Sequence, residues 1–193
     1  GKSIGHVTLD PDTAHPLLVV CDDQKSVMWR GEKQDLPKNP ERFEKMFCVL
    51  GCERFTSGRH CWEVEVEAGW KETMWAVGVA KESVQRKGVV GFCPKKGFWA
   101  VGKDFSVSVF PGQFWAFRSS KPNLLKLRWF WETPLTLSRE PRKIRVSLDY
   151  EEGCVKFFDA DTNESVFTFT SASFSGEEVR PFFWLNAGVV LKC

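Results

Sequence analysis

The chain has 193 residues, of which 42% are hydrophobic and 27% are charged, a composition that supports a folded core and excludes a disordered chain. Its 27 basic and 25 acidic residues leave a formal charge of +2, which excludes a strongly basic, histone-like protein. No apolar run reaches the ~18 residues of a membrane span, and the first residues do not resemble a secretory signal, so we expect a soluble, cytoplasmic protein.

Short extended segments recur along the whole chain, whereas no helical periodicity extends beyond one turn. The clearest pattern lies at residues 61–66, where Trp62 and Val64 alternate with Glu63 and Glu65, as is typical of a half-buried strand. The expected strands are, in chain order, Val7–Leu9, Leu17–Cys21, Ser26–Trp29, Cys61–Val66, Trp75–Ala80, Gly97–Val101, Phe114–Phe117, Lys143–Asp149, Cys154–Phe158 and Val166–Phe169.

The turn residues between these segments favour antiparallel pairing. Glu152-Gly153 separates two alternating segments and predicts a hairpin between them. About a dozen short strands without a long helix predict an all-β fold, namely a sandwich of two sheets. Residues 118–141 have the weakest strand pattern, and we expect them to form a long surface excursion.

Aromatic residues and cysteines are unusual in number. There are nine Trp and seventeen Phe but only one Tyr, and we expect some of these rings to face a partner. The seven cysteines are odd in number and irregularly spaced, so we expect reduced, mostly buried thiols rather than a disulfide framework.

Catalytic and metal-binding patterns are weak. Cys48, Cys52, His60 and Cys61 are potential zinc ligands, but adjacent strand residues such as His60 and Cys61 point to opposite faces. No histidine lies in a recognisable nucleophile motif, and no glycine-rich phosphate loop is present. We therefore expect no metal, no cofactor and no enzymatic activity.

Positive charge is concentrated between Arg118 and Arg145. This segment contains eight basic and two acidic residues, which give it a local charge of +6, and it includes the sequence Arg128-Trp-Phe-Trp131. Such a segment could bind single-stranded RNA, because rings stack on bases while cations neutralise phosphates. It could also bind an acidic or phosphorylated peptide, or form a core strand flanked by solvated cations.

Several sequence blocks resemble a known family. Val7–Pro16, Gln34–Phe43 and Cys48–Gly51 are similar to the PRY segment. The blocks similar to the SPRY domain are Phe55–Val66, Trp75–Val79, Ser83–Gly88, Gly97–Trp99, Val146–Tyr150 and, near the end, Pro181–Phe183. The chain thus resembles a single PRY-SPRY (B30.2-type) domain, with the PRY segment at 1–53 and the SPRY segment at 54–193. Tripartite-motif (TRIM) ubiquitin ligases and butyrophilins share this domain.

The resemblance implies a bent, concanavalin-like sandwich of two antiparallel sheets without catalytic activity, whose loops at one rim bind a protein or peptide. In a TRIM ligase, such a domain would select the substrate, while a coiled coil elsewhere in the parent chain would make dimers of an otherwise monomeric domain. The expected ligand-binding residues are Trp70, Trp75, Lys103, Phe105, Gln113, Phe114, Trp115, Arg118, Arg128, Trp184 and Asn186.

Two alternatives remain open at this stage. A butyrophilin-type domain would sense a small anionic, phosphoantigen-like ligand or bind a cytoskeletal partner, with Arg59, His60, Arg86 and Lys87 as its basic pocket. A third possibility is RNA binding through Arg118–Arg145, for which steep salt dependence is expected.

Overall fold

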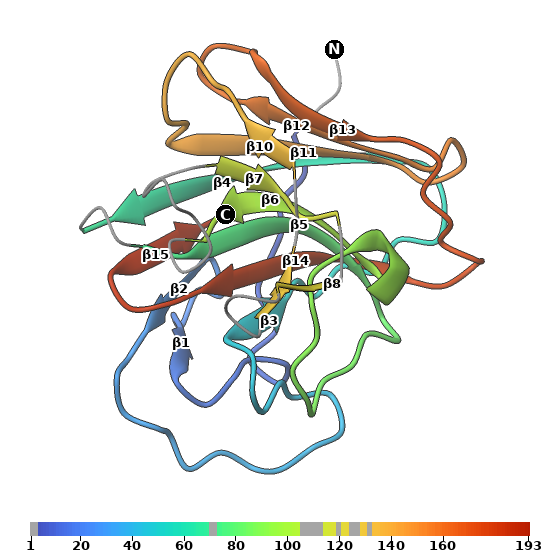
Figure 1. Ribbon diagram of the computed structural model, residues 1–193. Coiled ribbons are helices and arrows are strands. Elements are labelled where there is room, and N and C mark those ends of the chain that lie inside the picture. Colours follow the sequence, from blue (N-terminus) through green and yellow to red (C-terminus); the bar gives the residue numbers. More distant parts are fainter. Residues whose placement is uncertain (1–3, 70–72, 105–113, 119–120, 124–127, 131–132) are drawn as a thin grey trace.

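The computed structural model describes residues 4–69, 73–104, 114–118 and 134–193, and the backbone alone of residues 121–123, 128–130 and 133. Its elements are short strands and one 3₁₀ turn, η1 (Pro94–Lys96), which confirms the expected all-β class (Figure 1). The strands are β1 (Leu18–Val20), β2 (Ser26–Trp29), β3 (Cys48–Leu50), β4 (Arg59–Ala68), β5 (Trp75–Lys81), β6 (Phe98–Lys103), β7 (Phe114–Ala116), β8 (Lys121–Asn123), β9 (Arg128–Phe130), β10 (Thr133–Leu135), β11 (Lys143–Asp149), β12 (Cys154–Asp159), β13 (Ser165–Phe169), β14 (Val179–Leu185) and β15 (Val189–Lys192).

Two antiparallel sheets form the sandwich that the sequence predicts. A seven-stranded sheet has the order β1-β2-β15-β4-β11-β12-β13, and a six-stranded sheet has the order β10-β7-β6-β5-β14-β3. Strands β8 and β9 form a separate two-stranded sheet. Figure 1 shows β1 and β13 at opposite ends of the molecule, as their positions at the two edges of the seven-stranded sheet require.

Strand alternation builds the core between the two sheets. Trp62 and Val64 of β4 are buried there, whereas Glu63 lies on the opposite face. Its register partner is Arg145 of β11, whose Nη2 lies 3.1 Å from the Glu63 Oε2. The expected hairpin between β11 and β12 is also confirmed, since Asp149 pairs with Cys154 across the turn.

The six-stranded sheet is buried on both faces, so β5 and β6 are apolar almost throughout. A second hydrophobic cluster covers the face that points away from the seven-stranded sheet, and loop residues such as Phe43 and Phe92 contribute to it. We call it the outer cluster. Its buried members are Phe43, Met46, Cys48, Leu50, Ala76, Ala80, Val84, Phe92, Phe98, Ala100, Phe117 and Phe182.

Two glycines allow β5 and β6 to approach closely. A Cβ atom on Gly78 would lie 2.0 Å from the carbonyl oxygen of Trp99, and one on Gly102 would lie 1.9 Å from that of Trp75. Because such distances are sterically forbidden, only glycine fits at either position. This close approach holds β6 in place beneath the outer cluster.

A buried arginine ties the N-terminal segment to the rest of the molecule. The Arg180 side chain of β14 is 0% exposed. Its Nε donates to the Gly51 carbonyl oxygen at 2.9 Å, and its two Nη atoms contact Asp10 at 2.9 Å and Glu82 at 3.0 Å. All three nitrogens of the guanidinium are therefore paired inside the protein.

The structure departs from the expected elements at several places. Strands β3 and β15 are not among the expected ones. Val7–Leu9 forms one isolated bridge, Leu9 with Gly51, rather than a strand. Residues 118–141 contain the three short strands β8, β9 and β10, where a surface excursion was expected. Proline obscures the strand pattern here. Pro134 is tolerated because β10 is an edge strand, which does not need every N–H for pairing.

None of the described residues belongs to a helix with the length and hydrophobicity of a membrane span.

An ion pair near the β12–β13 turn predicts an acid-sensitive contribution to stability. Hydrogen bonds from Arg139 to the buried Asp159 lower the pKa of this carboxyl group to about 2. Because the folded pKa lies below the ordinary value, the contribution is fully present above about pH 4 and is lost as the pH falls toward 2. The free energy of unfolding in urea should therefore decrease between about pH 4 and pH 2, and Asp159→Asn should flatten this decrease.

Asp161→Asn is the matched control, since Asp161 contacts the same arginine at 3.2 Å but is 44% exposed. It should leave the pH dependence nearly unchanged. If the free energy of unfolding had the same pH dependence in the wild type and in Asp159→Asn, the Arg139–Asp159 ion pair would not be the source of the acid sensitivity.

Candidate functional site

Two tryptophans lie on one rung of the six-stranded sheet. Trp115 of β7 pairs with Gly102 of β6, Gly102 with Ala76 of β5, and Ala76 with Trp184 of β14. The two Trp Cα atoms are thus three strand spacings apart, ~14 Å. Both indoles are partly buried and pack against the outer cluster. We call this pair the tryptophan rung.

Aromatic rings of the outer cluster pack against Trp184 of the tryptophan rung. The ring of Phe92 lies 5.2 Å from that of Trp184 and 6.0 Å from that of Phe117, centroid to centroid. Phe117 lies 6.4 Å from Trp184. The rings meet edge to face, the arrangement that aromatic quadrupoles prefer. Trp184 is therefore held in place before any ligand arrives.

Two polar side-chain groups at the rung differ in their hydrogen bonding. Trp115 Nε1 is buried and has no acceptor within the part of the chain that the structure describes. The Nε1 atoms of Trp29, Trp62 and Trp75 are in the same state, so this donor does not by itself indicate a ligand. Asn186, by contrast, uses its Oδ1 to accept from the Met74 N–H at 2.9 Å, which fixes the segment after β14 to the residue before β5.

Three residues that were predicted to bind a ligand lie inside the protein instead, so the prediction is wrong for them. Trp75 is 0% exposed and Phe114 is 4% exposed; their rings contact each other in the core, with centroids 5.2 Å apart. Lys103 is buried, and its Nζ lies 2.8 Å from Glu140 Oε1. The side chains of β5 and β6 are buried except for that of Lys81, which is partly exposed, so an apolar residue there does not indicate a ligand contact.

Arg118 is exposed but does not lie beside the tryptophan rung. Trp115 and Phe117 alternate toward the outer cluster, and Arg118 follows on the other side, where its Cζ lies 5.9 Å from the centroid of the Phe167 ring. Among the remaining predicted contacts, Trp70, Phe105 and Gln113 lie outside the described residues, and only the backbone of Arg128 is described. The structure thus brings together Trp115 and Trp184 of the predicted set.

The alternative basic pocket is not assembled. Arg59 pairs with Asp149 at 2.9 Å, and the ring of its neighbour His60 stacks on Phe55 at 3.9 Å. Arg86 is buried elsewhere, over the ring of Phe43 and with hydrogen bonds to carbonyl oxygens.

The fourth predicted residue of that pocket, Lys87, is also engaged locally. Its Nζ donates to the carbonyl oxygens of Asn39 and Arg42 at 2.6 and 2.9 Å. Among the described residues, Arg59 and His60 share no contact residue with Arg86 and Lys87, so the four side chains stabilise two separate regions of the fold.

Two other expectations concern metals and nucleic acid. In the part of the chain that the structure describes, no three His, Cys, Asp or Glu side chains come together as a set of metal ligands. Two cations of the basic segment are engaged in ion pairs, since Arg139 contacts Asp159 and Arg145 contacts Glu63. This pairing weakens the case for RNA binding there.

Comparisons with known proteins identify the family. Residues 7–55 match the family model described as the SPRY-associated domain (PRY), and residues 59–193 match the SPRY domain. The chain belongs to the SPRY family. This assignment confirms the resemblance found in the sequence. The SPRY fold also matches a crystal structure of the TRIM65 PSpry domain, with a TM-score of 0.72 and 19% identity over 98% of this chain and 89% of that one.

Butyrophilins and TRIM proteins are both similar to this SPRY chain. Butyrophilin subfamily 1 member A1 of Bos taurus is 46% identical over 93% of the chain, and the E3 ubiquitin-protein ligase TRIM15 of Sus scrofa is 45% identical over 93%. The chain spans only 30% and 34% of these two relatives. A SPRY chain of this kind is a binding domain, and its similarity extends to both groups of parent proteins.

Sequence reasoning missed the supporting rings. Phe92 and Phe117 were not among the predicted site residues, although they hold Trp184. For Phe117 a signal was available, because the alternation in residues 114–117 places it on the same face as Trp115. For Phe92 the sequence offers no comparable signal, since it comes from a loop that folds back over the sheet.

Proposed function

We propose that this SPRY domain recognises a protein or peptide segment at the tryptophan rung, as the substrate-selecting module of a TRIM-type ubiquitin ligase. The observation that carries the proposal is the placement of Trp115 and Trp184 on one rung, partly buried and supported by a second hydrophobic cluster. Large rings held in this way bury apolar area at a small cost in side-chain entropy, which is why Trp residues dominate the energetics of many interfaces.

The chemistry of the site favours a polypeptide over a small anion. The rung offers two partly buried indoles, which suit apolar side chains and the flat faces of peptide groups. The four residues of the alternative basic pocket are engaged in internal contacts. A ligand at the rung would therefore combine apolar side chains with main-chain polar groups.

The role in a ubiquitin ligase rests on the relatives. The similar proteins include an E3 ubiquitin-protein ligase, TRIM15, and a SPRY domain in such a chain would bring the substrate close to the catalytic part. Coiled-coil dimerisation of such a parent would raise the apparent affinity, because the second binding event becomes intramolecular.

Trp184→Ala should weaken the binding of peptides selected from a phage-displayed library on the wild-type domain at least tenfold. The expected loss is about 2 kcal/mol for a central tryptophan anchor. Affinity is measured by isothermal titration calorimetry, and urea unfolding of each variant separates binding from stability. Trp184→Phe keeps an apolar ring in place and should retain part of the affinity.

The matched control is Trp29→Ala, which removes an equally half-buried indole from β2 of the other sheet. It should leave the affinity unchanged. If both Trp184→Ala and Trp115→Ala bound the selected peptides as tightly as the wild type, the rung would not be the recognition surface.

A further inference from the structure

The seven-stranded sheet ends in an edge strand that faces a cavity. β13 is the last strand of this sheet and pairs, among the described residues, only with β12. Its ladder is regular from Phe167 to Phe169, whereas the register shifts nearer its N-terminal end. Alternate residues of an edge strand direct their N–H and C=O groups away from the single neighbour. This regular part can therefore accept one more strand.

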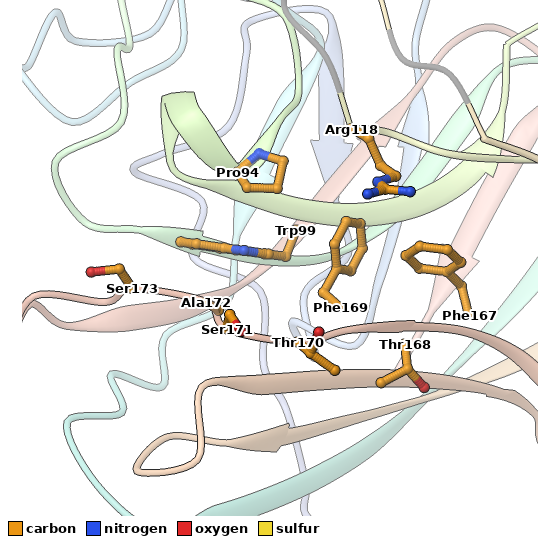
Figure 2. Close-up of a pocket in the computed structure, with 10 residues that line it drawn as sticks. All are labelled: Pro94, Trp99, Arg118, Phe167, Thr168, Phe169, Thr170, Ser171, Ala172 and Ser173. Atoms are coloured by element: carbon orange, nitrogen blue, oxygen red, sulfur yellow. The ribbon is translucent and has the colours of Figure 1, made fainter.

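The cavity beside this edge has a volume of about 600 Å³. Figure 2 shows it between β13 with its following residues on one side and Pro94 of η1, Trp99 of β6 and Arg118, which follows β7, on the other. The rings of Phe167 and Phe169 point toward Arg118, while Thr168 and Thr170 point the other way (Figure 2). We call this site the edge cavity; its lining residues are Pro94, Trp99, Arg118, Phe167, Thr168, Phe169, Thr170, Ser171, Ala172 and Ser173.

The charges around the edge cavity have one sign. Of the ten described residues that line it, none carries a carboxylate, and Arg118 carries a positive charge. Lys95 and Lys96 follow the lining residue Pro94 in η1, and both are exposed. Hydroxyl groups of serines and threonines supply further polar contacts. The site is therefore complementary to an acidic segment.

We propose that the edge cavity binds an extended acidic peptide, which adds to β13 as an eighth strand of the seven-stranded sheet. Strand addition supplies main-chain hydrogen bonds, and alternate side chains of the added strand supply the specificity. An acidic residue would face Arg118, and an apolar residue two positions away would face Pro94 and Trp99, because side chains two apart share one face of a strand. This second site is separate from the tryptophan rung and does not depend on its function.

Binding is tested with two labelled peptides of the same composition, using fluorescence anisotropy and the 193-residue chain. In the first, Thr-Glu-Thr-Val-Thr-Val, glutamate and valine share a face. In the second, Thr-Glu-Val-Thr-Thr-Val, glutamate and the next valine are adjacent and lie on opposite faces. The first should bind saturably and at least fivefold more tightly. Absence of saturable binding, or equal affinity for both peptides, would overturn the proposal.

N-methylation of alternate residues tests the main-chain hydrogen bonds directly. Two isomers of the first peptide carry N-methyl groups on the odd or on the even residues, so that side chains and charge are unchanged. One isomer should lose binding at least tenfold and the other should retain it, because only one set of N–H groups faces β13. Similar affinities for both isomers would exclude strand addition.

Arg118→Glu should weaken binding of the first peptide at least tenfold, and Arg118→Gln should have a smaller effect in the same direction. Arg142→Glu is the matched control, since Arg142 is exposed and does not line the cavity; it should change the affinity less than twofold. Equal effects of the Arg118→Glu and Arg142→Glu variants would overturn the proposal. The proposal would also be overturned if the chain bound no peptide but formed dimers that Arg118→Glu abolishes. The edge of β13 would then bind a second copy of the chain.

Discussion

Replacing Arg180 by methionine is expected to lower the free energy of unfolding by about 3–5 kcal/mol. The guanidinium is completely buried and contacts Asp10, Glu82 and the carbonyl oxygen of Gly51. Methionine fills part of the space but removes the ion pair with Asp10 and leaves a buried carbonyl without its donor, whereas Glu82 keeps its contacts with Arg86 and Arg54. For a domain of this size, the melting temperature should fall by roughly 10 °C. Urea denaturation and differential scanning fluorimetry would measure both quantities.

Arg54→Met is the matched control for Arg180. Arg54 also contacts Glu82, at 3.8 Å, and Glu178 at 3.2 Å, but its side chain is 42% exposed. Solvent screens such a pair, so the variant should lose less than about 1 kcal/mol. If both arginine variants lost the same free energy of unfolding, the burial of Arg180 would not be the cause of its contribution to stability.

Trp62→Ala is expected to destabilise the fold by a comparable amount, about 3–5 kcal/mol. Trp62 is 1% exposed at the centre of the core between the sheets. It stacks on Phe55, with centroids 5.8 Å apart, and pairs with Val146 across the β4–β11 ladder. Alanine would remove most of these contacts and leave a cavity that a rigid sandwich cannot close. The free energy of unfolding in urea gives the measurement.

Trp62→Phe separates ring packing from the polar group of the indole. Trp62 Nε1 is buried and has no partner within the described residues, so phenylalanine removes an unpaired donor together with part of the ring. The cost should be about 1–2 kcal/mol, well below that of alanine. If alanine were no more harmful than phenylalanine, the packing of Trp62 would contribute little to stability.

Much of the fold could be predicted because burial imposes a two-residue period. The alternation at Trp62 to Glu65 gave the orientation of β4, and Glu152-Gly153 gave the β11–β12 hairpin. Segments buried on both faces are harder to interpret, since they are apolar without alternation. Trp75 and Phe114, which the family resemblance places at a ligand surface, both lie in the core.

The candidate site could be predicted only in part, because it depends on register between strands far apart in sequence. Trp115 and Trp184 were both expected to bind a ligand, but their common rung follows from the pairing of β7, β6, β5 and β14. The partners of the basic residues could not be predicted at all. Nothing in the residue types shows that Arg86 lies over Phe43 while Arg59 pairs with Asp149, since such partners are chosen by tertiary contacts.

The sheet with hydrophobic clusters on both faces also limits how such a scaffold can acquire new specificities. The apolar side chains on β5 and β6 belong to one cluster or the other, and Gly78 and Gly102 tolerate no side chain at all. Mutations that alter ligand preference without loss of folding must therefore accumulate elsewhere, at loops and at strands such as β7 and β14 where a ring is only partly covered. The architecture separates the residues that can diversify from those that cannot.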